Sequence, residues 1–227
     1  MTNGLLMPLQ LVIFDCDGVL VDSEGPSNRI VAQEITALGW EMTQAQSSTL
    51  FVGCRLLDIA RLVELQIGLP VPDGWVDLLR ERLVTMLASE VEVMPGAHAA
   101  LSAVIALGLP LRVASNSSHE EMAVKFARTG LSSLVVDRLH SAQDVGAGKP
   151  APDVFLAAAA AEGVPAGACL VIEDSVPGAM AARAAGMACI GLAREGDDTG
   201  LRAAGARLIH SLDELPAILR AMMENVS

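Results

Sequence analysis

Short apolar runs recur along the chain, and each has the length of one β-strand. The first, "LQLVIFD" (residues 9–15), ends in a carboxylate. Continuous apolar runs of this length are typical of parallel strands that helices cover on both faces. Similar runs lie at 109–116, 169–174, 188–193 and 206–210. Together they predict a parallel sheet.

Helical patterns separate these runs. We expect helices at about 119–129, 152–162, 176–185 and 212–224. Ser118 and Glu121 have the spacing of a capping box, and Pro152 suits a first helical turn. Strands that alternate with helices at this spacing predict a doubly wound α/β domain.

Residues 22–95 break the alternation. Apolar side chains recur there at helical spacing in three groups: Val31, Ile35 and Leu38; Leu56, Ile59, Val63 and Ile67; and Val76, Leu79, Leu83 and Met86. Because this block stands between the first strand and the rest of the sheet, we interpret 22–95 as an inserted all-helical cap. The core would then comprise 1–21 and 96–227, with Pro95-Gly96 as the return hinge.

Composition narrows the function classes. A chain of 227 residues can hold one domain with a sizeable insertion. Its net charge of −12 disfavours nucleic acid and anionic membrane surfaces as partners. No apolar run approaches the roughly 20 residues that span a bilayer, and the first residues lack the basic region of a signal peptide. The four cysteines form no CxxC pair. We therefore expect a cytoplasmic protein with reduced thiols.

Polar residues gather where the predicted strands end. In an open parallel sheet, ligands bind beyond the carboxyl ends of the strands. The residues brought to that edge are Asp15 and Asp17, Ser115 and Asn116, Lys149, and Glu173 and Asp174. Each of them alone is more often a turn, cap or solvated loop residue, so the prediction depends on the combination. Lys149 is one of only two lysines in the chain.

This set of side chains suits phosphoryl transfer. Several carboxylates without a histidine cluster favour Mg²⁺ over zinc. A metal and a lysine among carboxylates can hold a phosphoryl group by offsetting its charge. An aspartate can then attack phosphorus and form an aspartyl-phosphate. Asp17 is placed to protonate the leaving oxygen and later to activate water.

Cys16, between the two aspartates, is the competing nucleophile. Alternate side chains of a strand face opposite ways, so Asp15 and Asp17 can share one side while Cys16 points into the core. Burial and adjacent negative charge raise the pKa of a thiol, which is the reverse of what a nucleophilic cysteine needs. We therefore expect Cys16 to be a packing residue.

Four motifs, in order, resemble those of the haloacid dehalogenase superfamily, and most closely its beta-phosphoglucomutase-like phosphatases. They are "DCDGVLVDSE" (15–24), "SN" (115–116), "GKPAPD" (148–153) and "IEDS" (172–175). The resemblance covers nearly the whole chain. It implies a Rossmann-like doubly wound parallel sheet core, a helical cap that closes over the site, and Mg²⁺-dependent phosphoryl transfer.

The resemblance also implies roles for single residues. Asp15 would be the nucleophile and Asp17 the acid/base, while Ser115 and Lys149 would bind phosphate with Asn116 nearby. The implied metal ligands are Asp15, Asp17, Asp174 and Glu173.

Substrate choice would fall to the cap, where family analogy points to Glu24, Gly53 and Arg55. A surface arginine at the start of a helix is an equally good interpretation of Arg55.

Departures from family patterns narrow the activity. True dehalogenases lack the second aspartate of the first motif. This chain has it, as Asp17, so dehalogenation is disfavoured. Ser27 and Val52 stand roughly where the mutases have a histidine and a lysine, and residues 22–95 contain no lysine for phosphonatase chemistry. The prediction is a Mg²⁺-dependent phosphatase for a small phosphorylated metabolite, a sugar or sugar-alcohol phosphate, acting as a monoester hydrolase. We expect a monomer or weak homodimer.

Three alternatives stay open at this point. One is a phosphosugar mutase on the same fold. The second is a signalling module that is phosphorylated on aspartate, although such modules are shorter and lack a cap. The third is a binding protein without activity, which no residue of the chain favours.

Overall fold

The computed structural model describes residues 7–51, 54–193 and 199–224. A six-stranded sheet has the order β5-β4-β1-β6-β7-β8, and every neighbouring pair is parallel. Its strands are β1 (Leu11–Phe14), β4 (Leu111–Ser115), β5 (Leu139–Ser141), β6 (Cys169–Glu173), β7 (Ala188–Leu192) and β8 (Arg207–Ile209). The predicted Rossmann-like α/β fold is confirmed.

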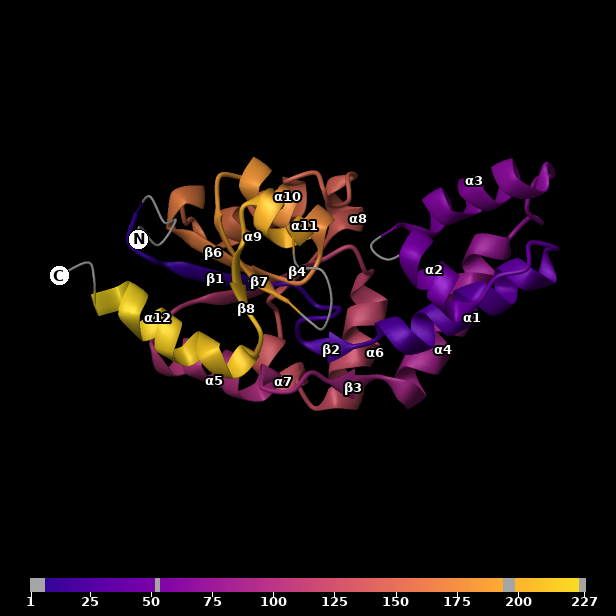
Figure 1. Cartoon of the computed structure of the whole chain (residues 1–227). Coiled ribbons are helices and arrows are strands. Elements are labelled where there is room, and N and C mark those ends of the chain that lie inside the picture. Colours follow the sequence, from indigo (N-terminus) through magenta and orange to yellow (C-terminus); the bar gives the residue numbers. More distant parts are fainter. Residues whose placement is uncertain (1–6, 52–53, 194–198, 225–227) are drawn as a thin grey trace.

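Helices cover both faces of this sheet. Figure 1 shows α5 (Ala97–Ala106) and α12 (Leu215–Glu224) on one side, and α9 (Asp153–Glu162), α10 (Val176–Ala184) and α11 (Thr199–Ala204) on the other. Strand β1 divides its side chains between the two layers, as the pleat requires. Val12 and Phe14 belong to the same core cluster as Leu101 of α5, whereas Leu11 and Ile13 pack with Phe155 of α9.

The predicted helices of the core agree closely with those observed. Helix α6 spans His119–Thr129, and Ser118 and Glu121 form the expected capping box at its start. The stretch predicted at 212–224 begins as a 3-10 turn, Leu212–Glu214, and continues as α12. Two short helices, α7 (Ser132–Val135) and α8 (Ala142–Val145), flank β5, and a further 3-10 turn at Ala166–Ala168 precedes β6.

A helical block lies between the first strand and the rest of the sheet. It consists of α1 (Glu24–Ala37), α2 (Gln44–Phe51), α3 (Leu56–Ile67) and α4 (Trp75–Glu90). Two short strands, β2 (Val21–Asp22) and β3 (Glu92–Val93), pair antiparallel and bring the chain into and out of the block side by side. Figure 1 shows the four helices at one end of the molecule, beside α6. Among the described residues, no helix is both long and apolar enough to cross a membrane.

Candidate active site

The strand ends that the sequence singles out meet at one edge of the sheet. Asp15 follows β1 directly, and its N–H donates a hydrogen bond of 2.9 Å to the Ile172 carbonyl of β6. Ser115 is the last residue of β4, and Glu173 is the last residue of β6. Because β1 lies between β4 and β6, these three residues occupy neighbouring positions at the carboxyl edge.

A buried ion pair joins Asp15 to Lys149. The Lys149 ammonium donates to Asp15 Oδ1 at 2.6 Å, to Glu173 Oε1 at 2.6 Å and to the Ala114 carbonyl at 3.0 Å. Burial raises the pKa of the Asp15 carboxyl to about 7, although Lys149 opposes this rise. Burial alone would lower the pKa of Lys149, but the charges of Asp15 and Glu173 outweigh it and raise that pKa.

The Asp17 carboxylate has a separate set of partners. Lys125 of α6 donates to its Oδ1 at 2.6 Å, and Ser23 donates to the same oxygen. Ser117 donates to Oδ2 at 2.8 Å. Burial alone would raise the pKa of Asp17, but the Lys125 charge and these hydrogen bonds outweigh it and lower that pKa.

Three carboxylates could hold a metal ion. Asp15, Glu173 and Asp174 each offer an oxygen within 4.8 Å of the others. Glu173 is fully buried, and its second oxygen accepts hydrogen bonds from the N–H groups of Asp174 and Ser175 at 3.0 Å. An oxygen-only donor set fits Mg²⁺, which prefers hard ligands. Asp17 was also predicted as a ligand, but its side chain is not part of this group, since its carboxylate faces Lys125.

Gly18 gives Asp174 its place in this group. A Cβ on Gly18 would overlap the Asp174 carboxylate, and the φ of Gly18 is +78°, which side chains rarely adopt. The glycine of the first motif is therefore required by both space and backbone conformation.

Ser115 and Asn116, both predicted to bind phosphate, follow each other at the end of β4. Asn116 Oδ1 accepts a hydrogen bond of 2.9 Å from the Lys149 N–H, so the amide holds the loop that carries the lysine. The buried Ser115 hydroxyl accepts a hydrogen bond of 3.1 Å from the Ser117 N–H. Asn116 is thus tied to Lys149, and Ser115 is tied to Ser117.

Of the predicted specificity residues, Arg55 reaches the core. It precedes α3 and donates to the Gly146 carbonyl at 3.4 Å while forming an ion pair of 2.9 Å with Asp58. The Arg55 side chain therefore borders the loop that carries Lys149. It is 45% exposed and so remains open to solvent. Glu24 opens α1, directly after Ser23. Gly53 lies outside the described residues, as does Val52.

Cys16 is fully buried and packs in the cluster that contains Val12 and Phe14. Burial, and after it the Asp17 charge, raises the pKa of the Cys16 thiol well above its usual value. Both observations agree with the prediction of a packing residue. Regular strand geometry ends at Phe14, so the argument from alternation does not extend to Asp17.

The sequence prediction missed Lys125 and Ser117. Lys125 is the second of the two lysines, so the scarcity that drew attention to Lys149 applies equally to it. Nothing local distinguishes it from a solvated helix residue, because its partner Asp17 lies 108 positions earlier.

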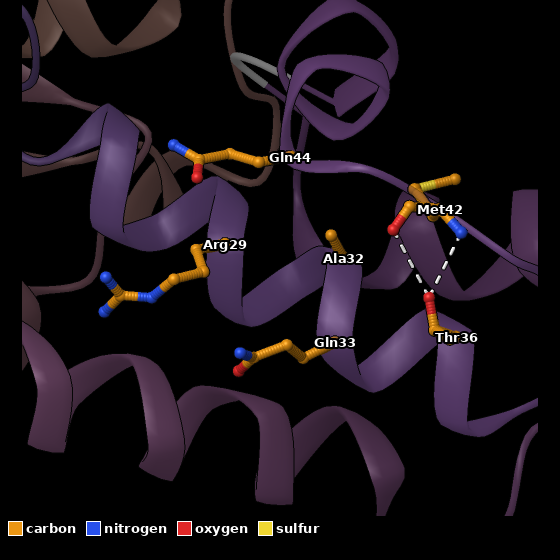
Figure 2. A pocket seen from close by; sticks show the side chains of 6 residues that line it. All are labelled: Arg29, Ala32, Gln33, Thr36, Met42 and Gln44. Atoms are coloured by element: carbon orange, nitrogen blue, oxygen red, sulfur yellow. Dashed lines mark hydrogen bonds between the residues drawn. The ribbon is translucent and has the colours of Figure 1, made fainter.

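A hollow in the helical block lies apart from these groups. It has a volume of about 310 Å³ and lies beside α1 (Figure 2). Its lining residues are Arg29, Ala32, Gln33, Thr36, Met42 and Gln44. None of the predicted catalytic, phosphate-binding or metal-binding residues is among them, so we place the candidate active site at the carboxyl edge of the sheet.

Comparison with known proteins identifies the class. Residues 9–186 match the family model of the haloacid dehalogenase-like hydrolases. The chain is 31% identical over 180 residues to the 6-phosphogluconate phosphatase of Escherichia coli (strain K12), covering 79% of this chain and 80% of that protein. It is 32% identical over 195 residues to a probable pseudouridine-5'-phosphatase of Drosophila melanogaster, with coverage of 82% and 83%.

A solved structure supports the same assignment. The conserved haloacid dehalogenase-like protein of unknown function from Agrobacterium tumefaciens is similar with a TM-score of 0.78 and 34% identity, over 94% of this chain and 99% of that chain. The chain therefore belongs to the haloacid dehalogenase-like hydrolases. The prediction of this family, and of a phosphoric monoester hydrolase within it, is confirmed.

Proposed function

We propose that this protein is a Mg²⁺-dependent phosphatase that hydrolyses a small phosphorylated metabolite, a sugar or sugar-alcohol phosphate, through an aspartyl-phosphate. The observation that carries the proposal is the buried Asp15 carboxylate, which contacts Lys149 at 2.6 Å beside Glu173 and Asp174. A carboxylate held between a fixed cation and a candidate metal site is suited to attack a phosphate ester.

In the proposed reaction, Asp15 attacks phosphorus and the ester oxygen leaves. Asp17 protonates the leaving oxygen in this first step and takes a proton from water in the second, when the aspartyl-phosphate is hydrolysed. Mg²⁺ bound by Asp15, Glu173 and Asp174 would offset the negative charge of the phosphoryl oxygens. The proposed ligand set also includes Asp17.

Lys149, Ser115 and Asn116 would bind the phosphoryl group. Lys149 supplies a buried charge that its two carboxylate partners hold in place. Ser115 lies at the end of β4, and Asn116 holds the backbone of Lys149. Their positions beside Asp15 support a phosphate site at this edge of the sheet.

We assign substrate choice to the helical block 22–95, acting as a cap over the core formed by 1–21 and 96–227. Arg55 supports this because it extends from the block to Gly146, in the loop before Lys149. Glu24 and Gly53 complete the proposed specificity set. The names of the two phosphatase relatives imply substrates that carry phosphate on a primary hydroxyl of a sugar-derived molecule, and we propose the same class here. The proposed enzyme works in the cytoplasm as a monomer or weak homodimer.

A phosphate-release screen over a panel of phosphorylated metabolites tests the proposal. With Mg²⁺ present we expect selective release from one or a few sugar or sugar-alcohol phosphates. Removal of Mg²⁺ with a chelator should abolish release, and added Mg²⁺ should restore it. Conversion of one sugar phosphate isomer into another without release would support a mutase instead, and a stable phosphoprotein without turnover would support the signalling module.

A further inference from the structure

Lys125 is a buried cation to which the proposed chemistry assigns no part. It lies in α6, one turn after Glu121 of the capping box, on the helix face that also carries the buried Met122 and Phe126. Only 3% of the residue is exposed. The apolar neighbours on this face show that the position belongs to the core, where an uncharged side chain would be the ordinary choice.

The partners of Lys125 are two groups at the active-site edge. Its ammonium donates to Asp17 Oδ1 at 2.6 Å and to the Ser117 hydroxyl at 2.8 Å. Ser117 in turn donates to Asp17 Oδ2 at 2.8 Å. Lysine and serine therefore bind one carboxylate through its two oxygens, and Ser23 adds a third donor from the start of α1.

Ser117 is itself fixed by the sheet. Its carbonyl accepts a hydrogen bond of 2.8 Å from the Ser141 hydroxyl of β5, and its N–H donates to the Ser115 hydroxyl. The Asp17 carboxylate is thus held by Lys125 of α6 and by Ser117, which lies between β4 and α6 and is itself held by the last residues of β4 and β5. Elements of this kind give a side chain a better defined position than loops do.

We propose that Lys125 is a positioning residue that, with Ser117, fixes the Asp17 side chain so that its carboxylic acid form gives a proton to the leaving oxygen and its carboxylate form later takes one from water. The inference rests on the proposed function and assigns Lys125 no contact with substrate. A buried ion pair is a costly way to gain stability, because both charges lose water. A requirement for a fixed carboxylate explains why the position holds lysine rather than an apolar residue.

The role predicts a dependence on the leaving group. An alkyl phosphate needs the proton from Asp17 because its alkoxide leaves poorly, whereas 2,4-dinitrophenyl phosphate does not. Misplacement of a catalytic group by about 1 Å can cost on the order of 10²-fold in rate. Lys125→Met should therefore lower kcat/KM for the alkyl phosphate found in the screen by about 10-fold to 10²-fold. It should lower kcat/KM for the dinitrophenyl ester by less than about 3-fold.

A double-mutant cycle separates positioning from a general structural effect. In an Asp17→Asn background the side chain that Lys125 positions no longer transfers a proton, so adding Lys125→Met should cause no further loss on the alkyl phosphate. Arg112→Met is the matched control, since it removes a partly buried cation that pairs with Glu162 at 2.8 Å and has no place in the proposed machinery. It should lower kcat/KM for both substrates by the same small factor.

Equal losses on both substrates, or an added loss in the Asp17→Asn background, would overturn the inference while leaving the proposed function intact. If circular dichroism shows that Lys125→Met does not fold, Lys125→Arg takes its place, because it keeps the charge but moves the donors. A selective loss of kcat/KM on the alkyl phosphate supports the role, and an equal loss on both substrates refutes it. If the wild-type protein released no phosphate from any ester, and so was as inactive as Asp15→Asn, both the proposed function and this inference would be refuted.

Discussion

Gly178 provides a stability test of the buried charges at the site. It is the third residue of α10, where Ser175 Oγ accepts its N–H, and its backbone lies outside the left-handed region. Helix propensity alone predicts that alanine here would stabilise the protein by about 0.5–1 kcal/mol. The tertiary environment predicts the opposite, because a Cβ would overlap the Glu173 carboxylate.

The size of the opposing effect follows from what Glu173 does. A Cβ on Gly178 would approach Glu173 Oε1 closer than 3.0 Å, a separation that real Cβ atoms essentially never show, and Glu173 is fully buried. The same oxygen accepts from Lys149 at 2.6 Å. Loss of one partner of a buried ion pair costs about 3–5 kcal/mol. Set against the helical gain, Gly178→Ala should destabilise the protein by about 2–4 kcal/mol.

Urea unfolding followed by circular dichroism measures this difference in the free energy of unfolding. Gly25→Ala is the matched control, since Gly25 also lies in the first turns of a helix and its added Cβ would have Gln44 Nε2 as nearest neighbour at 3.8 Å. That variant should be within about 1 kcal/mol of the wild type, since the lower chain entropy of alanine is offset by the following Pro26, which disfavours helical backbone for a residue with a Cβ. If Gly178→Ala were as stable as Gly25→Ala, the close packing of Glu173 against α10 would be wrong.

Two further substitutions test single residues. Cys16→Ala should keep phosphatase activity and lose about 1 kcal/mol of stability, because Cys16 only fills the core. A variant that circular dichroism shows to be folded and kinetics show to be inactive would restore the thiol as a candidate nucleophile. Arg55→Ala should lower kcat/KM for the specific substrate by about 10-fold or more and for an aryl phosphate much less, since a lost charged hydrogen bond costs roughly 1.5–3 kcal/mol; equal losses on the two substrates would remove Arg55 from specificity.

Local pattern predicted the central elements of the fold because they are regular and strongly apolar. Strand β1 is fully buried along its length and stands out in the sequence as a continuous apolar run. Strand β5, by contrast, is the three-residue edge segment "LHS", whose first two residues are only partly buried. Helix α2, "QAQSSTLF", buries only Ser47 and Phe51 and has no apolar repeat. Such elements are specified by their neighbours rather than by their own composition.

The residues of the candidate site also divide into those that local pattern predicts and those that it does not. Asp15, Ser115 and Glu173 were predictable because they stand at the ends of apolar strands, and parallel topology brings such ends together. Lys125 was not, because it sits in the mixed helix "HEEMAVKFART", where a lysine is ordinarily solvated. Its partner Asp17 lies 108 positions earlier in the chain, so no local pattern shows the pairing.

The central claim is that Asp15 carries the phosphoryl group. Rapid acid quenching during turnover of a substrate with radiolabelled phosphate, followed by peptide mapping, tests it directly. We expect label on the peptide that contains Asp15, release of that label by hydroxylamine, and neither label nor turnover in Asp15→Asn. Label on another residue, or an Asp15→Asn variant that keeps substantial phosphatase activity, would contradict the claim.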